Sequence, residues 1–376
     1  MSPFDTPKNA DHGAALTIDL GALVANWRTL GARAGTEAAA VVKADAYGIG
    51  IEPAVTALAA AGCRNFFVAH LSEGIRARAV AREATIYVLN GLPPESCATY
   101  AEHDLSPVLG SHEELLEWAG FRQGGARVRP AALHVDTAMN RLGLWVGEGL
   151  DLARERSGVI AAAEIGLVMS HFASSEDVAD PANARQIAAF AEIAAAFPGV
   201  PASLKNSSAH FLPDCPSYQL TRPGYALYGG NPTPGRPNPM QPVVGLEARI
   251  LQVREVAAGT QVGYNGRWTA QGRRRLATIS LGYADGYPRN ASWTDASPGG
   301  SALVGGLRCP FVGTVSMDLI IVDVTHAPAG AAVRGAPVTL IGGELDLEAV
   351  GAGAKTIGYE VLTSLGRRHA RRYVGL

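Results

Sequence analysis

The stretch EAAAVVKADAYGIGIEPAVTALAAAGCRNFFVAH (residues 37–70) decides the fold class. Its two apolar runs, 37–43 and 65–70, have the length and composition of buried strands, and the alanine-rich segment 51–62 between them has helical spacing of its apolar residues. A strand, a helix and a second strand in this order are typical of parallel α/β proteins.

The same alternation continues to residue 208. Further apolar runs lie at 84–90, 129–136, 164–171 and 202–208, and a second alanine-rich helical segment lies at 182–197. The number of units predicts a (β/α)8 TIM-like barrel as the N-terminal domain. A doubly wound sheet is the alternative, but no GxGxxG motif follows the first expected strand, 15–20.

A cluster of Pro, Gly and Asn at 229–242 indicates a domain boundary. Beyond it the chain reads as strands joined by turns, with a helix expected near 348–368. We therefore predict a barrel domain at 13–240, a mostly β domain at 241–376 and a flexible tail at 1–12.

The composition excludes several functional classes. The 376 residues carry a net charge of −2 without a long single-sign block, which argues against binding to nucleic acid or to a membrane surface. The four cysteines lack CxxC spacing, and no signal peptide or run of 18 apolar residues is visible. We expect a cytoplasmic protein with no metal site.

Polar residues recur where the expected strands end. Lys43 ends one apolar run, His171 ends another, Asn206 and Ser207 end a third, and Arg222 follows shortly after. Each alone has an ordinary explanation, and a lone lysine there is more often a solvated charge. The carboxyl ends of barrel strands meet at one face, however, so their shared placement predicts a functional site.

These residue types suit pyridoxal phosphate chemistry. A lysine amine can bond covalently to the cofactor's aldehyde, and the cofactor then acts as an electron sink. A free lysine has a pKa of about 10.4 and must lose its proton to react, so partial burial after two valines favours this role. Backbone N–H groups near Asn206–Ser207 and Gly224–Tyr225 are candidates for holding the phosphate.

A series of motifs follows in order along the chain. They are VVKADAYGIG (41–50), DTAMNRLG (136–143), SHFASSE (170–176), KNSSA (205–209), TRPGYALYGG (221–230), VGYNGRW (262–268), LGYADGYPR (281–289), GTVSMD (313–318) and IGYEVLTSLGRRHARRY (357–373). The linker lies between the fifth and the sixth motif. In this order, and with the linker in this place, the motifs resemble the alanine racemase family across nearly the whole chain.

The resemblance implies a homodimeric enzyme that uses pyridoxal phosphate to interconvert L-alanine and D-alanine, with D-alanine supplied to peptidoglycan. Lys43 would hold the cofactor and act as one base, and Tyr264 of the second subunit would be the other. Two bases on opposite faces of the substrate suit racemisation. A free phenol has a pKa of about 10, so a nearby His and Arg would be needed to stabilise its phenolate.

The resemblance also assigns the remaining site residues. The phosphate would be bound by Tyr47, Ser207, Gly224, Tyr225 and Tyr359, with Asn206 beside them. His171 would lie against the pyridine ring, Arg141 would contact the phenolic oxygen and the substrate, and Arg222 would bond the pyridine nitrogen. The substrate side would be shaped by Met317 and Asp318 from the second subunit, with Tyr283 at the entrance. A charged arginine at the pyridine nitrogen would weaken the electron sink and limit transamination.

Four positions depart from the family pattern. Asp45 and Ile49 replace the usual Asn and His of the lysine motif, and Glu176 replaces a common Asp. His134 occupies the place of a lysine that many members carbamylate to orient the arginine here numbered 141. We expect activity without carbamylation, with Arg141 positioned by His134 or by a bound anion.

Other functions remain open at this point. A racemase of broader or serine-type specificity is the nearest alternative, and a fold-related decarboxylase is disfavoured by Arg222. A non-catalytic cofactor-binding homeostasis protein would lack the β-rich second domain. A scaffold role would leave Lys43 and Tyr264 without a purpose.

Overall fold

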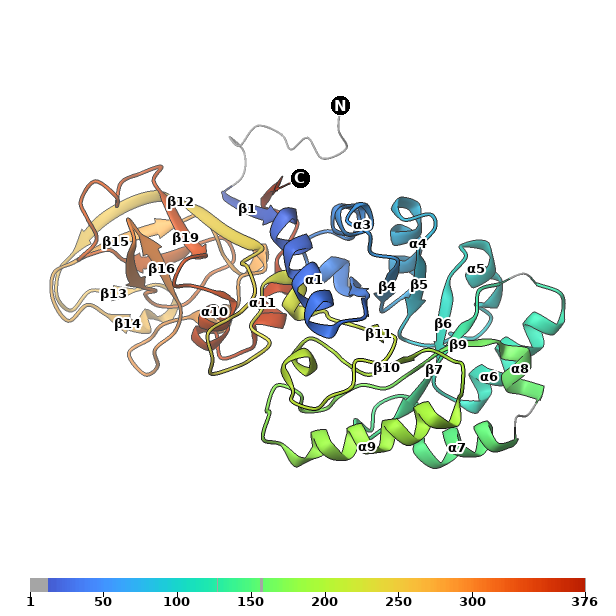
Figure 1. Ribbon diagram of the computed structural model, residues 1–376. Coiled ribbons are helices and arrows are strands. Elements are labelled where there is room, and N and C mark those ends of the chain that lie inside the picture. The colour runs from blue at the N-terminus through green and yellow to red at the C-terminus, as the bar shows by residue number, and fades with distance from the viewer. Residues whose placement is uncertain (1–12, 127, 156–157, 376) are drawn as a thin grey trace. The chain divides into compact units, whose positions relative to one another are not determined.

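The computed structural model describes residues 13–126, 128–155 and 158–375 (Figure 1). The chain divides into one unit formed by Leu23–Gln241 and a second formed by Pro242–Leu376 together with the residues before Leu23. The boundary after Gln241 lies one residue from the predicted domain boundary, after 240. The predicted flexible tail, 1–12, lies outside the described residues.

The first unit is a barrel of parallel strands. Its strands, in the order in which they pair, are β2 (Glu37–Ala38) continuing into β3 (Ala40–Val41), β4 (Asn65–Val68), β5 (Thr85–Val88), β6 (Ser106–Leu109), β7 (Ala131–Asp136), β9 (Ile165–Met169), β10 (Ala202–Ser203) and β11 (Leu220–Thr221). The short strand β8 (Leu144–Trp145) pairs with β7. The sequence-based expectation had missed β6 and β11.

Hydrogen bonds close this set of strands into a barrel. Arg222 N donates to Lys205 O at 2.8 Å, which joins the chain after β10 to the chain after β11. Strand β11 pairs with β2, and Val41 N donates to Pro223 O at 3.0 Å. The predicted TIM-like barrel is therefore confirmed.

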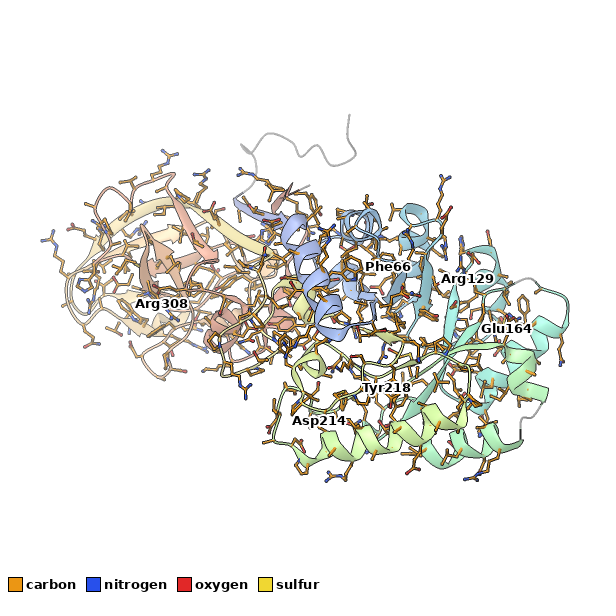
Figure 2. All side chains as sticks on the ribbon, viewed as in Figure 1. Phe66, Arg129, Glu164, Asp214, Tyr218 and Arg308 are labelled. Atoms are coloured by element: carbon orange, nitrogen blue, oxygen red, sulfur yellow. The ribbon has the colours of Figure 1, made fainter. Side chains whose placement is uncertain are left out.

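Helices connect the strands of the barrel. Helix α1 (Leu20–Ala34) precedes β2, and the helices between later strands are α3 (Ile51–Ala60), α4 (Leu71–Val80), α5 (Cys97–Glu102), α6 (His112–Gln123), α7 (Val146–Glu155), α8 (Gly158–Ala163) and α9 (Pro181–Ala196). Figure 1 shows them on the outer side of the curved set of strands. Figure 2 adds the side chains, among them Phe66 of β4, which is fully buried. In the described part of the chain, no helix combines the length and apolar content needed to cross a membrane.

The second unit is mostly β, as predicted. Its main sheet has the order β17 (Leu307–Pro310), β16 (Ser301–Val304), β19 (Pro337–Ile341), β12 (Val244–Val256), β1 (Ala14–Asp19) and β20 (Ala370–Val374), and β15 (Arg274–Ile279) joins β12 to β18 (Ile320–Asp323). Strands β13 (Gln261–Val262) and β14 (Trp268–Thr269) form a hairpin. The helix expected near 348–368 is two short helices, α10 (Leu347–Gly353) and α11 (Gly358–Ser364).

The first strand of the chain corrects the predicted start of the barrel domain. Strand β1 pairs antiparallel with β12 and parallel with β20, so residues 13–22 belong to the β-rich unit and not to the barrel. Its Leu16 and Ile18 are fully buried. The strand pattern at 15–20 was interpreted correctly, but a pattern does not specify which distant strands will pair with it.

Candidate active site

Lys43 lies two residues after β3, beyond the carboxyl-terminal end of the strand, and begins the short turn α2 (Lys43–Tyr47). The next four residues, Ala44 to Tyr47, have φ values between 52° and 55°, so this turn is left-handed. Such a conformation costs roughly 1–2 kcal/mol for each non-glycine residue. It persists only where surrounding contacts hold it, and strain of this kind is concentrated at functional sites.

The Lys43 side chain is half-buried. Burial and the positive charge of Arg141 lower the pKa of its amine, whereas the carboxylate of Glu73 opposes this shift. The amine is therefore more easily deprotonated than a solvated lysine. This is the property that a reactive lysine needs.

Tyr47, Ser207 and Gly224 lie together beside the turn. Ser207 Oγ accepts hydrogen bonds from Gly224 N at 3.0 Å and from Ala226 N at 3.2 Å. A Cβ atom added at Gly224 would lie 2.4 Å from Tyr47 Oη, so only glycine allows this close approach. Tyr225 is buried at the start of η2 (Tyr225–Tyr228). Hydroxyls and peptide N–H groups in this arrangement suit a phosphate.

Arg222 places a buried positive charge next to the ends of β9 and β10. Its Nη1 donates to Ser203 Oγ and its Nη2 to Ser170 O, both at 2.5 Å. No ion pair is found for it within the described ranges, and burial lowers its pKa. A guanidinium still remains protonated at neutral pH, so this charge is available to an electron-rich ligand atom.

Two histidines near Arg222 are held neutral. Burial, followed by the charge of Arg222, lowers the pKa of His171 to about 3 and that of His134 to about 4. Arg141 acts on both, and Lys43 acts on His171. These mutual effects indicate that Lys43, Arg141, His134, His171 and Arg222 lie near one another.

The loop that carries Arg141 is held by Asp136. The carboxylate of Asp136 accepts from Ala138 N (2.8 Å) and Met139 N (2.7 Å) through Oδ1, and from Arg141 N (3.1 Å) through Oδ2. The backbone of Arg141 therefore has a fixed position that does not depend on a carbamylated lysine. The exposed Glu176 has no contact that explains its replacement of Asp.

The sequence reasoning missed Gln186. This fully buried residue of α9 donates from Nε2 to Thr137 Oγ1 (3.1 Å) and to His171 O (3.0 Å), and its Oε1 accepts from Ala173 N (2.9 Å). It thus joins the loops after β7 and β9. A glutamine on the buried face of an alanine-rich helix was the available signal.

Asn206 also acts within the protein. Its Oδ1 accepts from Ser175 Oγ at 2.8 Å and from Ala209 N at 3.0 Å. These bonds connect the loops after β9 and β10. Its predicted place beside a bound phosphate stays a prediction.

The other predicted residues lie in the β-rich unit. Tyr264 begins η3 (Tyr264–Gly266) and is 69% exposed, and Met317 is 54% exposed. Tyr283 begins η4 (Tyr283–Asp285), and its N–H donates to Ser316 O at 3.1 Å, while Ala284 N donates to Met317 O at 2.9 Å. The loops 281–287 and 313–319 are therefore joined.

Asp318 and Tyr359 complete this second group. Arg368 donates to Asp318 Oδ1 at 2.8 Å and lies 3.3 Å from Asp285 Oδ1, which links Asp318 to the Tyr283 turn. Tyr359 lies on α11 and is exposed. The predicted site is thus divided between the two units, with the lysine in one and the candidate second base in the other.

Comparisons with known proteins agree with this arrangement. Residues 18–232 match the family description "Alanine racemase, N-terminal domain", and residues 243–373 match "Alanine racemase, C-terminal domain". The chain is 60% identical over 367 residues to the alanine racemase of Methylobacterium nodulans, covering 97% of each chain. It is 44% identical over 361 residues to a protein of Agrobacterium fabrum named "Alanine racemase, catabolic", covering 96% of this chain and 92% of the relative.

A solved structure is similar over the same length. The alanine racemase of Bartonella henselae, whose crystal structure contains covalently bound pyridoxal phosphate, is 40% identical to this chain. The TM-score is 0.90, and the match covers 96% of this chain and 99% of the other.

Proposed function

Because the chain belongs to the alanine racemase family, we propose that it interconverts L-alanine and D-alanine with pyridoxal phosphate as its cofactor. The observation that carries this proposal is the half-buried Lys43 at the end of β3, with a lowered amine pKa. The positively charged cluster of Arg141 and Arg222 around it suits the anionic groups of the cofactor and substrate.

The barrel residues fit the cofactor. When bound, pyridoxal phosphate supplies an electron sink for the negative charge that develops at the substrate Cα atom. Lys43 would hold it through the amine, and Arg141, Arg222 and His171 would supply contacts to its phenolic oxygen, pyridine nitrogen and ring. The phosphate would be held by Tyr47, Ser207, Gly224 and Tyr225, with Asn206 beside them and with Tyr359 from the β-rich unit. The contact between Tyr47 Oη and the Gly224 backbone supports this phosphate site.

Two bases carry the proton on opposite faces of the substrate. Lys43 accepts or donates it on one face, and Tyr264 does so on the other. The lowered pKa of the Lys43 amine supports its part, because a base must be unprotonated to accept a proton. Arg222 keeps its positive charge at neutral pH, and this charge disfavours a second positive charge on the pyridine nitrogen.

We also propose that the enzyme is a homodimer with composite sites. The exposed aromatic and apolar side chains of Tyr264, Tyr283 and Met317 lie on one group of loops, and such a patch is typical of an interaction surface. Tyr264, Met317 and Asp318 of one subunit then complete the site of its partner. Tyr283 lies at the entrance, where it limits substrate size.

The proposed location is the cytoplasm, where D-alanine is supplied for peptidoglycan. The four cysteines, Cys63, Cys97, Cys215 and Cys309, are buried and unpaired, which suits a reducing compartment. A second candidate role is the breakdown of D-alanine, because the Agrobacterium fabrum relative is named as catabolic. Growth of a deletion strain with and without added D-alanine separates the two roles.

One experiment tests the proposed reaction directly. Purified enzyme is incubated with L-alanine and, separately, with L-serine, and the D-enantiomers are measured. Borohydride is then used to fix the cofactor, and the modified peptide is identified by mass spectrometry. We expect D-alanine, much less D-serine, and modification at Lys43. Modification at another lysine, or no D-alanine, would overturn the proposal, and equal rates would favour the broader-specificity alternative.

A further inference from the structure

The left-handed turn after Lys43 is held from both sides by acidic residues. On the backbone, Asp45 N donates to Glu73 Oε1 at 3.3 Å, and Asp45 O accepts from Gly50 N at 2.9 Å. The other oxygen of Glu73 accepts from Ala69 N at 2.8 Å and from His70 N at 3.2 Å. One carboxylate therefore joins the turn to the start of α4.

The side chain of Asp45 makes a second set of contacts. Its Oδ1 accepts from Ile51 N at 3.1 Å, at the first residue of α3, and from Arg76 Nη2 at 2.7 Å. Arg76 in turn binds both carboxylate oxygens of Glu52, each at 2.6 Å. We call Asp45, Glu52, Glu73 and Arg76 the Asp45 network. It connects the turn to α3 and α4.

The network includes a carboxylate at position 45. In the lysine motif of the family this position usually carries an uncharged Asn, whereas here the carboxylate forms an ion pair with an arginine. Arg76 has two acidic partners, and the hydrogen bond to Arg76 lowers the pKa of Glu52. All three side chains are about one-third exposed, so the ion pairs alone contribute little to stability. Their effect must come from geometry.

We propose that Asp45, Arg76 and Glu73 are positioning residues that hold the left-handed turn and thereby aim the Lys43 amine and the Tyr47 hydroxyl toward the cofactor. The inference rests on the proposed function of Lys43 and deepens it. Lys43 is the first residue of the turn and Tyr47 is its last, so the backbone conformation of the turn sets the direction of both side chains. If it relaxed to a right-handed conformation, both groups would change direction together.

The effect of Glu73 on Lys43 supports this assignment. Its charge raises the pKa of the amine, against burial and Arg141, so the carboxylate lies close enough to act on it. Glu73 therefore accepts a hydrogen bond from the backbone of the turn, and its charge also acts on the Lys43 amine. A carboxylate that only capped α4 would need neither.

The test compares substitutions at Asp45 with a control elsewhere in the barrel. Asp45→Ala removes the acceptor for both Ile51 N and Arg76, whereas Asp45→Asn keeps an oxygen at the same position. Asp104→Ala is the matched control, because Asp104 also accepts from an arginine (Arg129 Nε, 2.7 Å) and has a positive φ, but precedes β6 at the amino-terminal end of the barrel strands. The full-length apoenzyme is titrated with pyridoxal phosphate, and kcat, KM and the thermal midpoint are measured for the holoenzyme.

We expect Asp45→Ala to raise the Kd for pyridoxal phosphate by about tenfold, which corresponds to about 1.4 kcal/mol. It should lower kcat more than it changes KM for alanine. Asp45→Asn should restore both values to within about threefold, and Asp104→Ala should lower the thermal midpoint without changing the Kd. Arg76→Met, at a partly exposed position, should weaken cofactor binding in the same direction and provides the test if Asp45→Ala does not fold.

Two results would overturn the inference. In one, Asp45→Ala and Arg76→Met lower the thermal midpoint as Asp104→Ala does but leave the Kd and kcat unchanged, which would mean that the network has only a structural role. In the other, Asp45→Asn is as impaired as Asp45→Ala, which would mean that the acceptor atom is not what matters. Failure of the proposed function is seen separately, because wild-type enzyme would then not be modified at Lys43 by borohydride.

Discussion

The carboxyl-terminal face of the barrel and the loop surface of the β-rich unit differ in how their site residues are held. In the barrel, Tyr47, Arg222 and Tyr225 are buried, and Arg222 is held by hydrogen bonds while Tyr47 stacks on a neighbouring ring. Lys43 is half-buried and Arg141 is exposed. In the β-rich unit, Tyr264 and Met317 are largely exposed. A proton-transferring group has to work away from bulk water. In the proposed function, the exposed residues of the β-rich unit therefore need another surface to cover them.

The electrostatics of the two regions differ in the same sense. The barrel cluster carries the positive charges of Arg141 and Arg222, and its two histidines are held neutral. The loop surface instead balances its charges, since Arg368 pairs with both Asp285 and Asp318. The first arrangement is ready for an anionic ligand, whereas the second stabilises the shape of its own loops.

Removing the amine of the barrel half should have the largest effect. Lys43→Ala should lower kcat by at least about 10³-fold, because the covalent attachment and one base are lost together. Lys205→Met is the control, since it removes the other lysine that the structure places in the barrel unit. It should retain cofactor that borohydride can fix. Retention of more than a tenth of the activity by Lys43→Ala would contradict the assigned role.

Removing the exposed phenol should have the next largest effect. Tyr264→Phe should slow racemisation by about 10²–10⁴-fold, the range typical of a general base. Because Lys43 would still act on one face, the Cα hydrogen of one enantiomer should exchange with deuterated solvent much faster than the molecule racemises. The free energy of unfolding should change by no more than about 0.5 kcal/mol. Equal, mild losses of exchange and racemisation would exclude the two-base assignment.

Acid should destabilise the barrel through His134. The pKa of His134 is lowered to about 4 by burial and by Arg222 and Arg141, against the opposing charge of Asp136. The unfolded chain therefore binds a proton below about pH 6.5 that the folded chain does not bind until about pH 4, so stability is present above pH 6.5 and is lost as the pH falls. The slope is about 1.4 kcal/mol per pH unit for this group.

The measurement is the unfolding free energy of cofactor-free enzyme between pH 7 and pH 4, wild type against His134→Asn. As the pH falls over this range, the free energy of unfolding of the variant should decrease less steeply than that of the wild type, and the difference in slope should correspond to about one bound proton. Identical slopes would show that His134 is not held neutral in the folded state.

The smallest effect is expected at the close contact between Gly224 and Tyr47. Gly224→Ala places a methyl group 2.4 Å from Tyr47 Oη and should weaken pyridoxal phosphate binding by about tenfold, as the hydroxyl is displaced. In Gly120→Ala, a Cβ in α6 meets no atom within 4 Å. That variant should be more stable by up to about 1 kcal/mol, with unchanged cofactor binding. Unchanged binding in both variants would remove Gly224 from the phosphate site.

Much of the barrel half was accessible from the sequence, because it depends on local patterns. The strand before Lys43 and the helix after it have clear periodicity, and strand ends in a barrel meet at one face. The pairing of β1 was not accessible, because its partners β12 and β20 lie more than 200 residues further along the chain. Strand β6 is as long as β4 and β5, but its sequence SPVL begins with Ser and Pro and lacks their continuous apolar run, and β11 has only two residues.

The left-handed turn was also beyond the sequence reasoning. Asp45 tolerates positive φ, but the alanines and the tyrosine of ADAY (44–47) disfavour it, so the stretch does not predict four such residues in a row. It is stabilised by Glu73 and Arg76, which come from a different helix. The motif located Lys43, whereas the contacts that orient its turn depend on tertiary structure.

Complementation between two inactive chains tests most directly whether the two regions form one site across subunits. Lys43→Ala and Tyr264→Phe chains, carrying different affinity tags, are mixed, dissociated and reassociated, and the doubly tagged dimer is purified. If the lysine of one subunit works with the tyrosine of its partner, each mixed dimer contains one intact site, and its activity should be about half that of the wild-type dimer. Mixed dimers that form in good yield but are no more active than the parent variants would contradict this account.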